Sequence, residues 1–190
     1  MWGHLAARCP QPGGIGTCPR NRKGTSMPVQ FKERAISVIV NNRPDVLARI
    51  AGTFSARGFN IESISANITR NPAVTKIIIT TLTTPDTITQ VIKQLNRLVD
   101  VLEARRLRRP QAVRREMILA RVPLAKERQA AIRELIDTRG GKTVSLEPGS
   151  TVLEFTGDKE DLEEILTRLE ALGMEDFSRT GVIALERSKP

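Results

Sequence analysis

The chain has 190 residues, of which 39% are hydrophobic, 27% are charged and 3% are aromatic. This length allows one large domain or two small ones, and the apolar fraction is sufficient for globular cores. No apolar run approaches the ~18 residues that a membrane-spanning helix needs, so we expect a soluble protein with no membrane partner.

The first part of the chain is rich in Gly, Pro and Arg and shows no periodicity, which predicts a disordered basic extension over residues 1–30. The only cysteines, Cys9 and Cys18, lie there, so no disulfide holds the fold and a cytoplasmic location is expected. With the single His they make a poor metal site, because structural zinc normally has four closely spaced ligands. An organellar location stays open if residues 1–26 are a transit peptide, as does a start at Met27.

Residues 31–107 carry the pattern of a βαββαβ unit. The expected elements are a strand at 35–40, a helix with Val46, Leu47, Ile50, Ala51 and Phe54 on one face and Gly58 as its end, strands at 60–68 and 74–83, a helix capped by residues 84–86, and a strand at 101–107. The strand at 74–83 holds three consecutive isoleucines, so both of its faces are apolar. One face meets the helices, and something else should cover the other.

After a linker at 108–112, residues 113–190 repeat this order. The expected elements are a strand at 116–122, a helix at 126–139, a hairpin of strands at 142–146 and 151–156, a helix capped by Asp158, and a strand at 182–185. The fold class is therefore α+β, with two ferredoxin-like βαββαβ domains. Each has only about 75 residues, and such small cores are marginal alone, which favours pairing within or between chains.

The turn before the first helix is the strongest candidate site. Pro44 suits a first helical turn, and Asn42 and Asp45 are expected to cap its free amides. A helix N-terminus favours an anion such as a carboxylate. Asn60 opens the following strand, and beside a neighbouring copy the two amide side chains would bracket a small zwitterion. The alternative is an ordinary strand–turn–helix junction.

Residues that carry catalytic chemistry are missing from the predicted domains. From Met27 onward the chain has no His and no Cys, so the usual pairs of nucleophile and base are absent. The acids at 160–161 and 163–164 fit a solvated helix face, and Gly140 and Gly141 end a helix instead of forming a phosphate loop. We therefore expect a protein without catalytic residues, cofactor or metal of its own.

The formal net charge is +9, and much of the excess lies at the linker. The clustered residues are Arg105, Arg106, Arg108, Arg109, Arg114 and Arg115. Nucleic-acid binding, a solvated linker and a contact with an acidic protein all fit such a cluster. RNA-recognition motifs share the βαββαβ order but stack bases on aromatics of their first and third strands. Residues 36–40 and 76–80 hold no aromatic, so no nucleic-acid partner is expected.

Four blocks resemble the regulatory small subunit of acetolactate synthase and lie in the order found in that family. They occupy residues 36–50, 54–64, 93–101 and 115–119. The runs RGFNIES at 57–63 and LNRLVDV at 95–101 are specific to the family, whereas the proline-and-leucine turn is shared by many amino-acid-binding ACT domains. The resemblance covers residues 34–187.

The resemblance implies an ACT domain at 31–107 and a C-terminal domain that helps to bind and activate a catalytic large subunit. That partner is expected to carry thiamine diphosphate, Mg and FAD, and to act in valine, leucine and isoleucine biosynthesis. A homodimer through the ACT domains would bind valine. The implied effector residues are Asn42, Asp45, Val46 and Leu47 of one protomer and Asn60 and Ile61 of its neighbour. A stand-alone amino-acid-binding ACT regulator is the alternative.

One residue departs from the family pattern. Position 45 is normally Gly, which lets the backbone approach a ligand carboxylate closely, whereas this chain has Asp45. The added negative charge puts effector binding in doubt and leaves the subunit assignment untouched.

Overall fold

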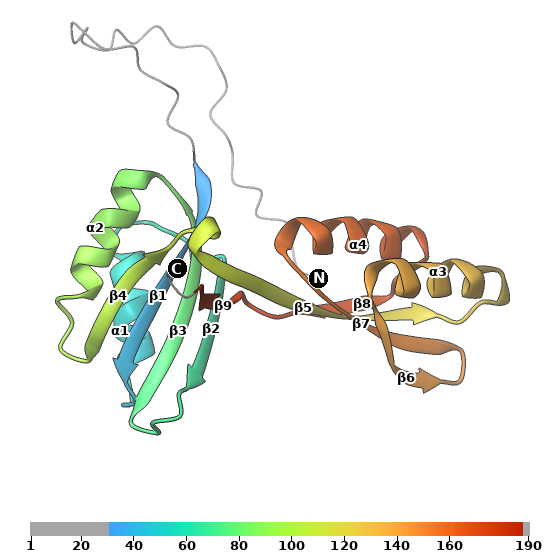
Figure 1. Cartoon of the computed structure of the whole chain (residues 1–190), viewed down its shortest axis with the longest axis horizontal. Helices are drawn as coiled ribbons and strands as arrows, with labels where there is room; N and C mark the ends of the chain where they lie inside the picture. The colour runs from blue at the N-terminus through green and yellow to red at the C-terminus, as the bar shows by residue number, and fades with distance from the viewer. Residues whose placement is uncertain (1–30, 188–190) are drawn as a thin grey trace, which may run out of the picture.

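The computed structural model describes residues 31–187, which form two α+β units joined by one long strand (Figure 1). We call residues 31–107 the N-terminal unit and residues 113–187 the C-terminal unit. In each unit two helices lie on the same face of an antiparallel sheet. The predicted basic extension, with Cys9, Cys18 and the single His, lies outside the described residues. Among the described residues no helix is long and apolar enough to cross a membrane.

The N-terminal unit has the predicted βαββαβ order. Its elements are β1 (Lys32–Asn41), α1 (Val46–Ser55), β2 (Ser63–Ile68), β3 (Val74–Thr83), α2 (Pro85–Leu95) and β4 (Val101–Leu107). The strand order is β2-β3-β1-β4, so β2 and β4 are the edges. Alternate residues of β1 and β3 turn toward the helices, and Ile36, Ile77 and Ile79 are fully buried against α1 and α2. As predicted, the Thr84 side chain caps α2 by accepting a hydrogen bond from the Thr87 amide.

The C-terminal unit repeats this order and adds one strand. Its elements are β5 (Ala112–Pro123), α3 (Gln129–Arg139), β6 (Lys142–Glu147), β7 (Ser150–Gly157), α4 (Lys159–Ala171), β8 (Asp176–Arg179) and β9 (Ile183–Glu186). The sheet runs β6-β7-β5-β8, and its core packs Ile118, Phe155 and Leu162 among the helices. Asp158 caps α4 as predicted, by accepting from the Asp161 amide.

Three details of the predicted elements were wrong. The strand expected near 182–185 is present as β9, but β8 at Asp176–Arg179 was missed, because this mostly polar stretch carries no apolar alternation. Residues 126–128 form a separate 3-10 turn before α3. The segment at 60–62 is a loop: the Asn60 carbonyl is taken by the Thr81 hydroxyl, and regular pairing with β3 begins at Ser63.

The second apolar face of β3 is covered by the end of the same chain. We call residues 181–187 the C-terminal strap. Val182 of the strap is buried with Ile78 in a small cluster that joins the two units. The other members of this cluster are Ala35, Leu107, Ala112 and Ala184. The second apolar face of β3 is therefore covered by a segment of the same chain. The apolar surface around Ile78 does not require a second copy of the protein.

Polar contacts fix the strap in register. Lys76 Nζ donates to the Ala184 carbonyl at 3.0 Å, and Arg105 pairs with Glu186 at 2.8 Å. Gly181 allows the closest approach, since a Cβ built there would lie 2.7 Å from the carbonyl oxygen of Ile64 in β2. The backbone of Ile64 cannot move aside as a flexible side chain would. Any residue larger than Gly at position 181 therefore forces the two units apart.

We predict that Gly181→Ala lowers the free energy of unfolding by about 1–3 kcal/mol, the usual cost of forced overpacking. Gly52→Ala in α1 is the matched control, because a Cβ there meets nothing within 4 Å and Ala favours a helix. Urea unfolding followed by circular dichroism measures both. An unchanged midpoint for Gly181→Ala would contradict the described packing of the strap.

Candidate functional site

The candidate site surrounds the turn between β1 and α1. The Asn42 amide donates to the Ala73 carbonyl at 2.7 Å, and its side-chain Nδ2 donates to the Pro72 carbonyl at 2.9 Å. Both bonds tie this turn to the start of β3. The Asn42 side chain is therefore engaged with the β2–β3 turn, and the prediction that it caps α1 was wrong.

Asp45 is the only non-glycine residue with positive φ among residues 31–187. Its φ of 67° and ψ of −6° are left-handed, and its side chain makes no capping bond to α1, so this second capping prediction was also wrong. The two side chains that do cap, on Thr84 and Asp158, belong to residues with extended backbone, which is the conformation that aims a side chain at the following amides. The left-handed conformation costs most residues about 1–2 kcal/mol; Gly adopts it freely, and Asn and Asp adopt it occasionally.

Asp100, which directly precedes β4, anchors the turn and was given no role by the sequence analysis. Asp100 is 7% exposed. Its carboxylate accepts a hydrogen bond from Arg49 Nη1 at 3.0 Å and lies 3.6 Å from Arg43 Nη1. The Asp100 carbonyl also accepts from the Asn41 amide. Both arginines near Asp45 are thus paired with Asp100, which leaves the exposed Asp45 carboxylate without an ion-pair partner among the described residues.

The other expected effector residues separate into two places. Val46 belongs to the buried core, whereas Leu47 beside it is 47% exposed. Asn60 and Ile61 lie at the opposite end of β3, where the Glu62 amide donates to the Thr80 carbonyl. From residue 73 to residue 80 the strand spans about 20–25 Å at ~3.3 Å per residue. One chain therefore does not bring the two groups together.

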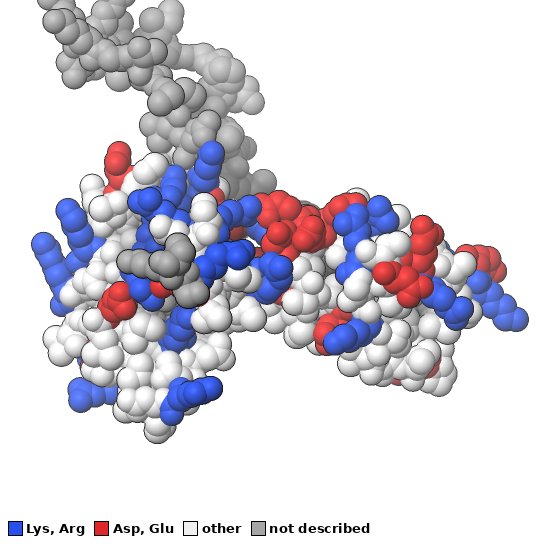
Figure 2. All heavy atoms as spheres, viewed as in Figure 1, with Lys and Arg blue, Asp and Glu red and all other residues white. Residues whose placement is uncertain are grey.

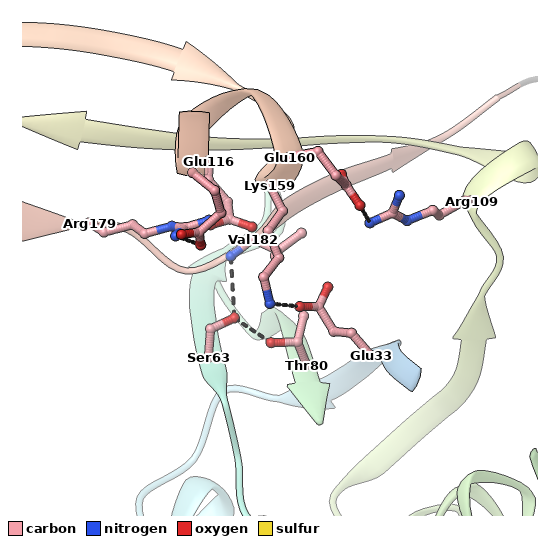
Figure 3. Close-up of polar contacts among 10 residues, drawn as sticks. Glu33, Ser63, Thr80, Arg109, Glu116, Lys159, Glu160, Arg179 and Val182 are labelled. Carbon is pink, nitrogen blue, oxygen red and sulfur yellow. Dashed lines mark hydrogen bonds and ion pairs between the residues drawn. The ribbon is translucent and has the colours of Figure 1, made fainter. Parts of the chain in front are cut away.

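A cleft of about 540 Å³ lies between the two units, next to Ile61. Figure 3 shows its polar wall, in which Arg179 pairs with Glu116 at 2.6 Å and Lys159 pairs with Glu33. The bond to Glu33 raises the pKa of Lys159 above its ordinary value. Glu33, Glu116 and Glu163 each pair with a cation, whereas Glu62 has no ion pair among the described residues, so the cleft is largely an ion-paired joint. Of the acids in this cleft, only Glu163 was assigned to a solvated helix face by the sequence analysis, and Glu33 and Glu116 were given no role.

The ion-paired joint also contacts the start of β2. The Ser63 hydroxyl shares a hydrogen bond of 2.7 Å with the Thr80 hydroxyl and accepts from the Val182 amide of the strap at 3.5 Å (Figure 3). Ser63 follows Asn60 and Ile61 by two to three residues. The 60–62 loop is therefore connected to the C-terminal unit through Ser63 at the start of β2.

Comparison with known proteins covers both units. Residues 36–103 match the family of ACT domains like that of the acetohydroxyacid synthase (AHAS) small subunit, and residues 115–188 match the small subunit of acetolactate synthase. A probable acetolactate synthase small subunit of Methanothermobacter thermautotrophicus is 35% identical over 154 residues, which cover 80% of this chain and 91% of the relative. The chloroplastic small subunit 2 of Arabidopsis thaliana is 34% identical over 84% of this chain, which spans a third of that longer protein.

The fold agrees with these matches. The crystal structure of the acetolactate synthase small subunit from Thermotoga maritima superposes with a TM-score of 0.77 at 29% identity, over 84% of this chain and all of that one. The paired domains, their order and their sequences agree over both units, and the chain belongs to the acetolactate synthase small subunit family, with an ACT domain as its N-terminal unit.

Proposed function

We propose that this chain binds and activates the thiamine diphosphate-dependent catalytic subunit of acetolactate synthase in branched-chain amino-acid biosynthesis. The observation that carries the proposal is the match of both units, in order, to the two parts of the small subunit. Condensation of pyruvate with pyruvate or 2-oxobutyrate would then take place on the partner, which would carry thiamine diphosphate, Mg and FAD. The role of this chain is to hold the partner in an active conformation.

The test is an acetolactate assay of the purified catalytic subunit with increasing amounts of the full chain. We expect the rate to rise and to saturate at a fixed molar ratio, because a stoichiometric complex forms. The chain after thermal unfolding serves as the control. A rate that stays at the level of the catalytic subunit alone, with no complex in size-exclusion chromatography, would overturn the proposal.

We further propose that valine binds between two ACT domains. Asn42, Asp45 and Leu47 of one copy would meet Asn60 and Ile61 of the other, and Val46 would support the site from the core. The proposal is supported by the distance between the two groups in one chain, since a site using both needs two copies. The N-terminus of α1 suits a carboxylate, and the exposed Leu47 offers an apolar contact.

Strand order within one chain supports the β2 edge for the proposed dimer. If β2 pairs antiparallel with the β2 of its partner about a two-fold axis, the start of one strand lies beside the end of the other. Asn60 of one copy then lies near the partner's β2–β3 turn, to which Asn42 is bonded. Pairing through β4 would leave β2, and with it Asn60, on the outer edges of the dimer and away from the partner's Asn42, so only the β2 edge would assemble the site.

We therefore predict a dimer through β2, whose outward residues include Ile68 at 62% exposure. Ile68→Lys should yield monomers, because it places two charges at the shared edge. Leu102→Lys on β4, at 55% exposure, is the matched control and should remain dimeric. Light scattering at micromolar concentration distinguishes these outcomes. A wild-type monomer, or loss of the dimer only in Leu102→Lys, would count against the β2 interface.

Asp45 should weaken this effector site. Two like charges ~4 Å apart repel by about 1–4 kcal/mol at surface dielectric values, and each 1.4 kcal/mol weakens affinity about tenfold. We predict weak valine inhibition of the holoenzyme, strengthened about tenfold or more in Asp45→Gly with activation unchanged. Because Arg43 and Arg49 pair with Asp100, neither neutralises Asp45 in the described structure.

Asp45→Asn separates charge from backbone strain. Asn tolerates the left-handed conformation and carries no charge, so it should restore valine inhibition as Gly does, whereas only Gly should also raise the melting temperature. Valine titration of the holoenzyme and thermal unfolding of the chain give the two readouts. Equally tight inhibition of wild type and both variants would falsify the repulsion argument.

A further inference from the structure

Much of the arginine cluster noted in the sequence lines one pocket at the junction of the two units. The pocket has a volume of about 870 Å³ and lies between the start of β1, the end of β4 and the start of β5. Its cationic lining includes Lys32, Arg34, Arg106, Arg108, Arg109 and Arg114. Figure 2 shows Lys and Arg gathered over the N-terminal unit and the junction, while Asp and Glu concentrate on α4.

The acids of this pocket already form ion pairs within the chain. Only Glu33 and Glu160 line it among the described residues, and they pair with Lys159 and Arg109, respectively. The hydrogen bond from Arg109 lowers the pKa of Glu160, so this acid stays ionised and paired with Arg109. Of the remaining cations, Arg34 donates to the Thr83 carbonyl and Arg114 to the Leu107 carbonyl, which are neutral partners. The pocket therefore has a surplus of positive charge.

This surplus is costly in the folded chain. Arg34 is 8% exposed, and the Nε atom of the half-buried Arg114 has no hydrogen-bond partner within residues 31–187. Burial, followed by repulsion from Arg34 and Arg108, lowers the pKa of Arg106. Burial and Arg109 lower the pKa of Arg114 in the same way. Buried polar groups and charges are normally paired, so these arginines favour an anion that does not belong to residues 31–187.

We propose that this pocket binds a small molecule carrying two or more phosphate groups. Guanidinium groups bind phosphate oxygens in bidentate fashion, and several arginines suit a multiply charged group better than a single carboxylate. Phe31 and Leu82, both more than half exposed, line the same pocket and offer an apolar surface to an organic part of the ligand.

The surroundings disfavour a nucleic acid. The basic surface ends at α4, whose N-terminal half carries Glu160, Asp161, Glu163 and Glu164. Over the N-terminal unit there are eleven basic and six acidic residues, against twelve basic and fifteen acidic over the C-terminal unit. A polymer that leaves the pocket across α4 meets repulsion, whereas a compact anion stays within the basic lining. Such an anion contacts both units and holds them together.

The test uses the full chain and inorganic pyrophosphate as probe, with no catalytic subunit present, so it is independent of the proposed function. Calorimetry should show saturable binding, and the melting temperature should rise more than in NaCl of equal ionic strength. The double variant Arg106→Gln with Arg108→Gln should weaken binding at least about tenfold. It should also melt higher than wild type in low salt without the anion, because repulsion is removed.

The control is Arg70→Gln with Arg133→Gln, which removes the same charge at exposed positions outside the pocket and should bind as wild type does. Arg114→Gln provides a second pocket variant if the first folds poorly. Equal stabilisation by pyrophosphate and NaCl, or equal loss of binding in both double variants, would overturn the proposal. Binding of a single-stranded oligonucleotide more tightly than pyrophosphate, lost in the pocket variants, would replace it with a polymer site.

Discussion

The packing of Val182 against Ile78 is the contact on which the arrangement of both units depends. A βαββαβ unit buries one face of its sheet under its own helices, but β3 is apolar on both faces. The strap resolves this by lying across the second face, while β9 pairs with the first four residues of β5. The position of the C-terminal unit relative to the ACT domain is thus set by the need to exclude water from one isoleucine face.

The elements that the sequence predicts best are those specified by local chemistry. Thr84 and Asp158 precede apolar helical stripes, and both cap as expected. Asp45 looks equivalent in sequence and fails, because the turn is shaped by distant bonds to Ala73 and Asp100 that hold it left-handed. The loop at 60–62 is irregular for the same kind of reason. Residue pattern fixes periodic segments, whereas tertiary contacts decide the turns between them.

The candidate site residues also divide into those that the sequence predicts and those that depend on tertiary contacts. The sequence and its family resemblance predict Asn42 and Asn60 as effector residues, but only the register of β3 shows that they lie at opposite ends of one sheet. The partners of Asp100 and of Arg179 are far away in the chain and leave no local signal. The sequence reveals the arginine cluster, but the net charge of the pocket depends on which acidic side chains lie beside it in the fold. Glu33 and Glu160 do so and are already paired with Lys159 and Arg109.

The strap also has a consequence for how the protein is made. β9 leaves the ribosome after every other element of the two units, and until then the outer face of β3 has nothing to cover it. The ACT domain can form its helix-covered core during synthesis, as N-terminal domains commonly do, but it carries an exposed isoleucine face while the C-terminal unit is still being translated. The outer face of β3 is therefore the last part of the two units to be covered, and a chain that lacks the strap exposes Ile78 to water.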